Sequence, residues 1–221
     1  MNLLPLKELT VDVVEAGARR RKGMVPCRLG QNIDFDLEAL ESFSSIKWQT
    51  TVYDALVVAA VVEFCDRSLS RSAMYWGRNF SVHIPVHDPD KWSDKTVTRA
   101  LVEALNLLTG DDWHFEFRAR KTAAKPPPQD RMRFPSNVEA VIAYSDGMDS
   151  CAVAGLESKH LGRRLVRVRV GSKQHDVSKK ERLRIPFTAI PYSVKLDNGR
   201  NAENSARSRG FKFSVVSTIA A

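Results

Sequence analysis

The sequence lacks the features that mark several specialised protein classes. It has only 3 cysteines, Cys27, Cys65 and Cys151, which lie far apart and favour reduced thiols in a cytoplasm over a disulfide framework. The longest uninterrupted apolar run, 55–62, has eight residues, whereas a membrane-spanning helix needs about 20. The first ten residues have no basic stretch followed by an apolar one, so no signal peptide is expected. Apolar residues at 43% and charged residues at 27% exclude disordered, collagen-like and coiled-coil chains. We therefore expect a cytoplasmic protein without a membrane partner.

Positive charge is concentrated in the last part of the chain. Of the net charge of +8, residues 137–221 carry +7, with 15 Lys and Arg against 8 Asp and Glu. Such a surface attracts polyanions, among them nucleic acid, nucleotide phosphates and pyrophosphate. A solvated basic face with no partner is an equally good interpretation.

A proline-rich stretch predicts the division into domains. Residues 125–130 include three consecutive prolines, which remove backbone donors and can continue neither a helix nor a central strand. We expect an extended linker over 125–136. It would separate an N-terminal α+β accessory domain, 1–124, from a second domain, 137–221.

The first domain mixes helical and strand patterns. Apolar spacing predicts helices at 37–43, 52–65 and 97–108, with Gly110 ending the last, and strands at 80–86 and 113–117. Because both strands alternate apolar and polar residues, we expect an antiparallel or mixed sheet with helices on one side.

The second domain has the pattern of a βαβ unit. A nearly continuous apolar strand at 138–144 is followed by a polar turn, a helix at about 150–160 and a strand at 165–170. This order predicts parallel strands and a Rossmann-like α/β fold. A third strand is expected at 187–192 and a helix at 203–221.

The turn after the first of these strands is the main candidate site. Its sequence is Ser145-Asp146-Gly147-Met148-Asp149-Ser150. Hydroxyl groups, a glycine and a helix N-terminus at the carboxyl end of a parallel strand favour a bound phosphate. The sequence contains neither a Walker A motif nor G-x-G-x-x-G.

This turn resembles the S-G-G-x-D-S signature of the PP-loop ATP pyrophosphatases, which have the adenine nucleotide alpha hydrolase-like fold. The resemblance implies that residues 145–150 bind the pyrophosphate of ATP together with Mg²⁺, and that Asp149 and Ser150 are catalytic. Asp146 stands where the family has its first glycine. Its negative charge would have to be offset by Mg²⁺ or by nearby arginines.

A second segment is similar to the downstream arginine element of the 7-cyano-7-deazaguanine synthases, the QueC-like family. It spans 203–211, Glu-Asn-Ser-Ala-Arg-Ser-Arg-Gly-Phe, and makes Arg207 and Arg209 candidates for charge-assisted hydrogen bonds to the nucleotide phosphates. Surface arginines near a helix start are the alternative.

The first domain resembles the extra N-terminal domain of the QueC-like proteins of bacterial anti-phage operons, the QatC and type IV CBASS relatives. The residues that carry this resemblance are Asp66-Arg67, Trp76-Gly77-Arg78, Ile84-Pro85-Val86, Trp92, Leu108-Thr109-Gly110-Asp111-Asp112-Trp113 and Phe115-Glu116-Phe117-Arg118.

The family resemblance implies an ATP-dependent carbon–nitrogen ligase. It would adenylylate the carboxylate of 7-carboxy-7-deazaguanine, releasing AMP and pyrophosphate, to form an amide and nitrile as in queuosine biosynthesis. In antiviral defence, the activated carboxylate would instead be joined to an amine of a protein from the same operon. The alternatives are a PP-loop tRNA-modifying enzyme and a non-catalytic nucleotide-binding or interaction subunit.

Several other residues have both a functional and a structural interpretation. Cys151 is either a nucleophile beside a helix N-terminus or a packing residue. The tryptophans Trp76, Trp92 and Trp113 either stack on a base or pack internally. The basic run 19–22 either contacts nucleic acid or forms a solvated turn between two strands.

We expect no metal site formed by the protein's own residues. His83 and His87 lack a carboxylate or thiol partner at ligand spacing. The sequence also has no C-x-x-C, so the structural zinc site of QueC-like enzymes is not expected.

The second domain has only 85 residues and two or three expected strands, whereas a nucleotide-binding domain of this type has about five parallel strands. We therefore expect it to be truncated, or to be completed by another segment, a second chain or a homo-oligomer. The apolar helix expected at its end would also need a covering partner.

Overall fold

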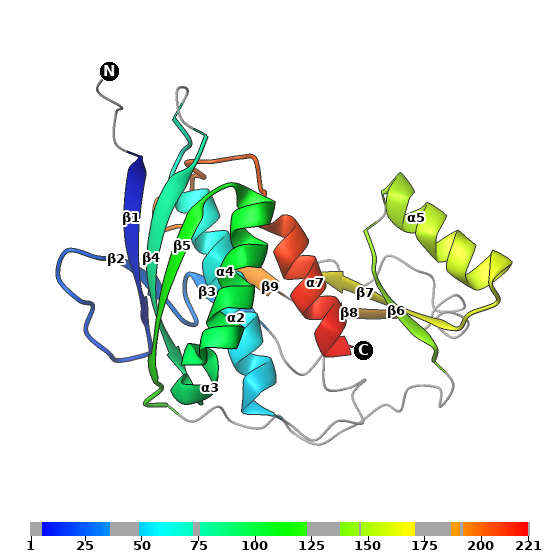
Figure 1. Ribbon diagram of the computed structural model, residues 1–221, viewed down its shortest axis with the longest axis horizontal. Helices are drawn as coiled ribbons and strands as arrows, with labels where there is room; N and C mark the ends of the chain where they lie inside the picture. The colour runs from blue at the N-terminus through cyan, green and yellow to red at the C-terminus, as the bar shows by residue number, and fades with distance from the viewer. Residues whose placement is uncertain are drawn as a thin grey trace. The chain divides into compact units, whose positions relative to one another are not determined.

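The computed structural model describes residues 6–35, 49–72, 76–122, 138–145, 147–170, 187–190 and 192–220 (Figure 1). The chain forms two compact units. The first contains Met1–Asp34, Thr50–Ala124 and Val194–Lys212, and the second contains Phe35–Gln49, Lys125–Ser193 and Phe213–Ala221. The chain thus returns to the first unit near its end, whereas the sequence predicts a single division at the linker. The linker, 125–136, lies outside the described residues.

The first unit is built on a four-stranded sheet whose strands are all parallel. The strands are β1 (Lys7–Val14), β2 (Val25–Arg28), β4 (Arg78–Val86) and β5 (Asp112–Ala119), in the order β2-β1-β4-β5. The register sets Asp12 of β1 opposite His83 of β4, and His83 opposite Glu116 of β5. Side chains from three strands therefore form one row across a face of the sheet.

The predicted antiparallel or mixed sheet is wrong for this unit. Alternation in β4 and β5 suggested strands with one solvated face, but His83 and Pro85 on that face of β4 are buried. On β4, His83 pairs with Glu116 of β5 and lies beside Arg21 of the loop between β1 and β2, whereas His114 and Glu116 on the same face of β5 are exposed. The alternation therefore indicates exposure correctly for β5 but not for β4. The strand-helix-strand order of 78–119, which is typical of parallel pairing, was the better signal.

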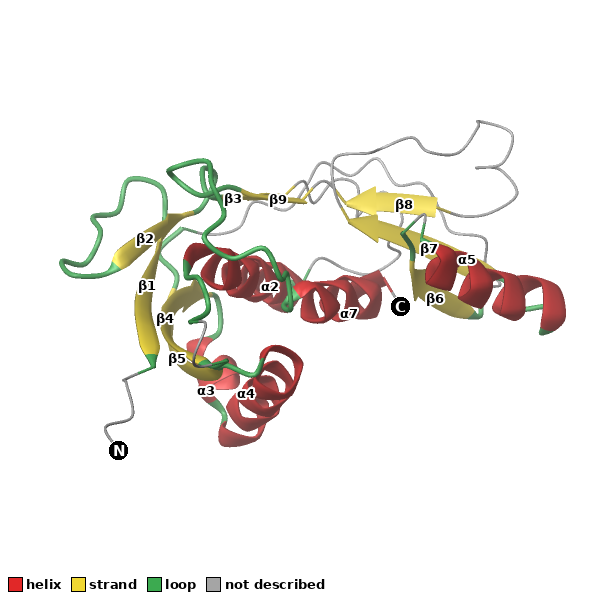
Figure 2. Cartoon of the chain, turned by 90° about the horizontal axis from the view of Figure 1, so that it is seen from above, coloured by secondary structure: helices red, strands yellow, loops and turns green. Residues whose placement is uncertain are grey.

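Helices cover the other face of this sheet. They are α2 (Thr50–Ser68), α3 (Pro89–Ser93) and α4 (Lys95–Thr109), and Figure 2 shows all three on one side of the strands. The apolar run of the sequence lies in α2, where 56–62 is at most 1% exposed. Gly110 ends α4 in the left-handed conformation with φ of 71°, as predicted. Helices at 52–65 and 97–108 are confirmed, whereas the helix predicted at 37–43 lies outside the described residues.

A buried ion network joins the start of β4 to α2 and to the turn before β5. Arg78 is completely buried and its Nη2 donates to Asp66 and Asp111, each at 2.6 Å. Arg71 binds Asp111 through both of its terminal nitrogens, at 2.7 and 2.8 Å. Burial alone would lower the pKa of Arg78, but the hydrogen bonds to the two aspartates raise it above its ordinary value.

The second unit contains a three-stranded parallel sheet and a crossover helix. The strands β6 (Ala140–Ala143), β7 (Leu165–Val170) and β8 (Phe187–Ile190) lie in the order β6-β7-β8. Between β6 and β7 the chain forms α5 (Met148–Gly155), which continues as a π-helix, η1 (Leu156–His160). The predicted parallel βαβ unit and its third strand are confirmed.

Two short strands and one helix complete the described structure. The strands β3 (Ile33–Phe35) and β9 (Tyr192–Val194) pair with each other, and α7 spans Arg209–Ala220. The helix predicted at 203–221 therefore begins six residues later than expected. None of the helices in the described part of the chain is long and apolar enough to cross a membrane.

Candidate functional site

The turn between β6 and α5 places the predicted phosphate-binding residues at the carboxyl end of a parallel strand. Strand pairing continues to Tyr144, whose N–H donates to the carbonyl of Val168 at 2.7 Å. Ser145 follows directly, and Gly147 is the N-cap residue of α5. Asp146 lies outside the described residues. The turn thus has the position in the fold that the sequence predicts for it.

Two serine hydroxyls form a hydrogen bond across this turn. The Oγ atoms of Ser145 and Ser150 lie 2.8 Å apart, and the Ser145 N–H donates to Ser150 Oγ at 3.1 Å. A Cβ atom on Gly147 would lie 3.2 Å from Ser145 Oγ, which is closer than most side chains pack. The glycine therefore allows the backbone to pass close to the paired hydroxyls.

Within the described residues, no side chain caps the first turn of α5. Gly147 has an extended conformation and caps the helix with no side-chain hydrogen bond, while its carbonyl accepts from the N–H of Cys151 at 3.1 Å. Met148 and Asp149 are exposed, and Asp149 is the acidic residue of this turn. Free N–H groups and the helix dipole make such an end favourable for an anion.

Cys151 lies beside this turn. Its side chain is exposed, and its Sγ lies 3.2 Å from the hydroxyl oxygen of Tyr144. The thiol therefore has a polar neighbour and access to solvent, instead of the apolar surroundings of a packing residue. Its reactivity stays a prediction.

Both predicted phosphate-binding arginines lie in the segment that belongs to the first unit. The Arg207 guanidinium lies 4.1 Å from the centroid of the Trp76 ring and donates to the carbonyl of Thr109 at 3.4 Å. Arg209 is exposed and is the first residue of α7. Arg207 is thus engaged by a cation–π contact within its own unit, and its role toward phosphate stays a prediction.

The two histidines considered as metal ligands each pair with a carboxylate. His83 Nδ1 lies 2.9 Å from Glu116, and His87 Nδ1 lies 2.7 Å from the completely buried Asp54. The described residues contain no group of three or more His, Cys, Asp or Glu side chains that could hold a metal ion.

The sequence did not predict a polar cluster on the face of the first sheet that α2, α3 and α4 do not cover. Arg118 Nη1 donates to the buried Asp12 at 2.7 Å, and Arg21 Nη1 lies 3.1 Å from His83 Nδ1 and 3.3 Å from Glu116. The hydrogen bond from His83 is the main reason that the pKa of Glu116 is lowered. The run 19–22 does form the predicted turn between two strands, but Arg21 also binds across the sheet. Acidic and basic residues at alternate positions of neighbouring strands were the available signal.

The three tryptophans that the structure describes, Trp76, Trp92 and Trp113, do not form a common stacking surface. Trp113 is 1% exposed, stacks on Phe80 with ring centroids 4.5 Å apart, and donates its indole N–H to Thr109. Trp92 packs against Phe117, with ring centroids 5.4 Å apart. Trp76 is 66% exposed, with Arg207 over its ring. Internal packing is therefore the correct interpretation for Trp113.

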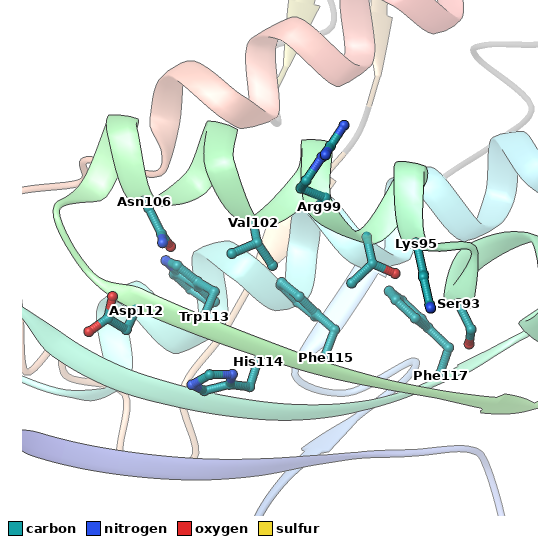
Figure 3. A pocket seen from close by; sticks show the side chains of 11 residues that line it. Ser93, Lys95, Arg99, Val102, Asn106, Asp112, Trp113, His114, Phe115 and Phe117 are labelled. Carbon is teal, nitrogen blue, oxygen red and sulfur yellow. The ribbon is translucent and has the colours of Figure 1, made fainter.

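A cavity of about 740 Å³ lies between α4 and β5 (Figure 3). Aromatic side chains of β5 form one wall. The ring centroid of Phe115 lies 5.9 Å from that of Trp113 and 5.8 Å from that of Phe117, and both pairs of rings are stacked. Arg99 and Asn106 of α4 line the cavity opposite them. Most of the remaining lining is polar or charged, namely Ser93, Lys95, Thr98, Arg99, Asn106, Asp112 and His114. None of the predicted phosphate-binding residues belongs to it.

Comparison with known proteins assigns no family to these sites. No family model, no curated protein and no solved structure matches the chain.

Proposed function

We propose that the chain is a QueC-like PP-loop enzyme that uses ATP to adenylylate the carboxylate of a 7-deazaguanine such as 7-carboxy-7-deazaguanine. One observation carries the proposal. The turn of residues 145–150 connects a parallel strand to a helix N-terminus, with Ser145 and Ser150 hydrogen-bonded across it. This is the environment in which backbone N–H groups and hydroxyls bind a polyphosphate.

The residues of the turn suit the triphosphate of ATP. The N–H groups of Met148, Asp149 and Ser150 lie in the first turn of α5, where the helix dipole adds a partial positive charge. The two serine hydroxyls are bonded to each other, so one of them keeps a hydrogen that it can donate to a phosphate. Mg²⁺ would neutralise phosphate charge, and the exposed carboxylate of Asp149 is a suitable oxygen ligand for it.

The proposed reaction has two substitution steps. A carboxylate oxygen of the substrate attacks the α-phosphorus of ATP, the bond from that phosphorus to the bridging oxygen breaks, and pyrophosphate leaves. The nitrogen of ammonia or of a protein amine then attacks the acyl carbon, AMP leaves, and the nitrogen loses a proton. The turn acts in the first step, because it holds the leaving pyrophosphate where charge develops. Anti-phage defence is the proposed setting of the protein-amine reaction.

The proposal is tested by measuring AMP and pyrophosphate release from the full chain supplied with ATP, Mg²⁺ and 7-carboxy-7-deazaguanine. Release should depend on the deazaguanine. Ser150→Ala should lower the rate by about 100-fold or more, the usual effect of removing a donor to transition-state charge.

Ser158→Ala is the matched control, because Ser158 is an exposed serine of the following η1 segment. Among the described residues, its hydroxyl bonds only to the carbonyl of Ala154 in its own helix. It should react like the unmodified protein. The absence of substrate-dependent release, or equal rates for the two variants, would contradict the proposal.

A further inference from the structure

The parallel sheet of the first unit has a point where its strand order reverses. From β1 the chain passes to β2 on one side, and it later returns to β4 on the other side of β1 before continuing outward to β5. In open parallel sheets, ligands bind in the crevice outside the carboxyl ends of the strands at such a reversal. The carboxyl ends of β1 and β4 are therefore the place to search for a second site.

A cavity of about 510 Å³ lies there, within the usual size range of small-molecule sites. We call it the β1–β5 cavity. It is lined by the ionic side chains Asp12, Glu15, Arg19, Arg21, Arg118 and Lys121, together with Gly17, Ala18 and Ala119. Glu15 directly follows β1, and Lys121 follows β5 by two residues, so the cavity is at the strand ends.

The two carboxylates of the cavity are already satisfied by the protein. Asp12 accepts from Arg118 at 2.7 Å and from the N–H of Arg21 at 3.1 Å. Glu15 accepts from the backbone N–H groups of Lys121 and Thr122. Neither carboxylate therefore repels an incoming anion with its full charge.

The cationic side chains of the cavity have N–H groups that are available to a ligand. Within the described part of the chain, the exposed side chains of Arg19 and Lys121 form no hydrogen bond or ion pair. Arg118 uses one hydrogen of each terminal nitrogen, toward Asp12 and the Val13 carbonyl, and a guanidinium has five. The lining has four cations against two carboxylates, a net charge of +2, so the cavity is positive.

We propose that the β1–β5 cavity binds a small molecule through its phosphate group, with Arg19, Arg118 and Lys121 as the phosphate donors. Guanidinium groups match phosphate geometry, and a lysine ammonium adds a point charge. The Asp12–Arg118 pair positions one of these guanidinium groups in advance, so that less conformational freedom is lost on binding. This site is independent of the turn at 145–150.

The test is a titration of the full chain with inorganic phosphate at constant ionic strength, followed through the backbone amide resonances. The amides of Gly17, Ala18 and Lys121 should shift and saturate. The double variant Arg19→Gln, Lys121→Gln should bind at least about tenfold more weakly, since a charge-assisted hydrogen bond is worth that factor. It should stay folded, because both side chains are exposed.

A second double variant, Lys91→Gln, Lys95→Gln, provides the matched control. It removes the same charge from exposed positions of α3 and α4 outside the cavity and should bind phosphate like the unmodified protein. Ser150→Ala should leave the shifts at Gly17 and Ala18 unchanged, which separates this site from the turn. The proposal is overturned if these amides do not shift, or if both double variants weaken binding equally.

Discussion

Asp111 holds two arginines at once in the interior of the first unit. Its carboxylate accepts from Arg78 at 2.6 Å and from Arg71 at 2.7 and 2.8 Å, and it is 1% exposed. Asp111→Asn would leave positive charge buried with only Asp66 to balance it. We expect a loss of about 3–5 kcal/mol in the free energy of unfolding, measured by urea denaturation.

The exposed pair Arg99–Glu103 is the comparison for this prediction, since its side chains are 74% and 71% exposed. Arg99→Met should cost less than about 0.5 kcal/mol. If Asp111→Asn costs no more than Arg99→Met, the buried network does not have the structural role assigned to it.

Whether residues lie together in the fold could be predicted from the sequence for some groups and not for others. Residues 145–150 are consecutive, so their meeting at one turn follows from local order. Asp12, His83 and Glu116 lie on three strands, and they meet only because the register sets them opposite one another. The register depends on pairing between distant segments, so the apolar pattern of each strand does not predict which residues lie opposite one another.

At the scale of elements, α2 is a helix buried around most of its circumference. Leu56 is completely buried, as are Val57, Val61 and Val62. Leu56→Ala should therefore lower the free energy of unfolding by about 2–5 kcal/mol, the usual cost of such a cavity. Leu107→Ala on α4, at a position 87% exposed, should change it by less than about 0.5 kcal/mol. Equal effects in urea denaturation would show that α2 is not the core helix.

The positions of several elements could be predicted, but β1 and β2 were not among them, and alternation did not give the directions of the strands in the first unit. Strands at 80–86 and 113–117 and the helix ending at Gly110 are confirmed. One-sided polarity led to the wrong expectation of an antiparallel or mixed sheet. The polar positions His114 and Glu116 of β5 are exposed although the sheet is parallel, and His83 on the same face of β4 is buried. In 138–170, the order strand, turn, helix, strand correctly predicted the parallel arrangement.

At the scale of the whole molecule, the chain returns to its first unit near the end, and Glu203 helps to hold it there. One Glu203 oxygen accepts from the Arg71 N–H at 3.0 Å, and the other accepts from the N–H groups of Asn204 and Ser205. These bonds, that from Arg71 foremost, lower the pKa of Glu203 from 4.5 to about 2. The predicted single boundary at the linker could not include this return, which depends on contacts between segments distant in sequence.

The lowered pKa gives a pH dependence with a definite sign. The folded state favours the carboxylate, so Glu203 stabilises the protein above pH 4.5, and this contribution is lost as the pH falls toward 2. Glu203→Gln should therefore destabilise the protein at pH 7, and the difference from the unmodified protein should shrink between pH 4.5 and 2. The free energy of unfolding of both proteins, measured by urea denaturation at pH values from 7 to 2, tests this prediction. A difference independent of pH would mean that the carboxylate charge has no part in holding the segment.

The central claim is that the turn between β6 and α5 binds the phosphates of a nucleotide. Its most direct test is a titration of the full chain with ATP and Mg²⁺, followed through the backbone amides of Gly147, Met148, Asp149 and Ser150. We predict shifts that saturate in the unmodified protein and in Ser158→Ala, and that are strongly weakened in Ser150→Ala. Unshifted amides in this turn, or the same affinity in Ser150→Ala as in the unmodified protein, would contradict the claim.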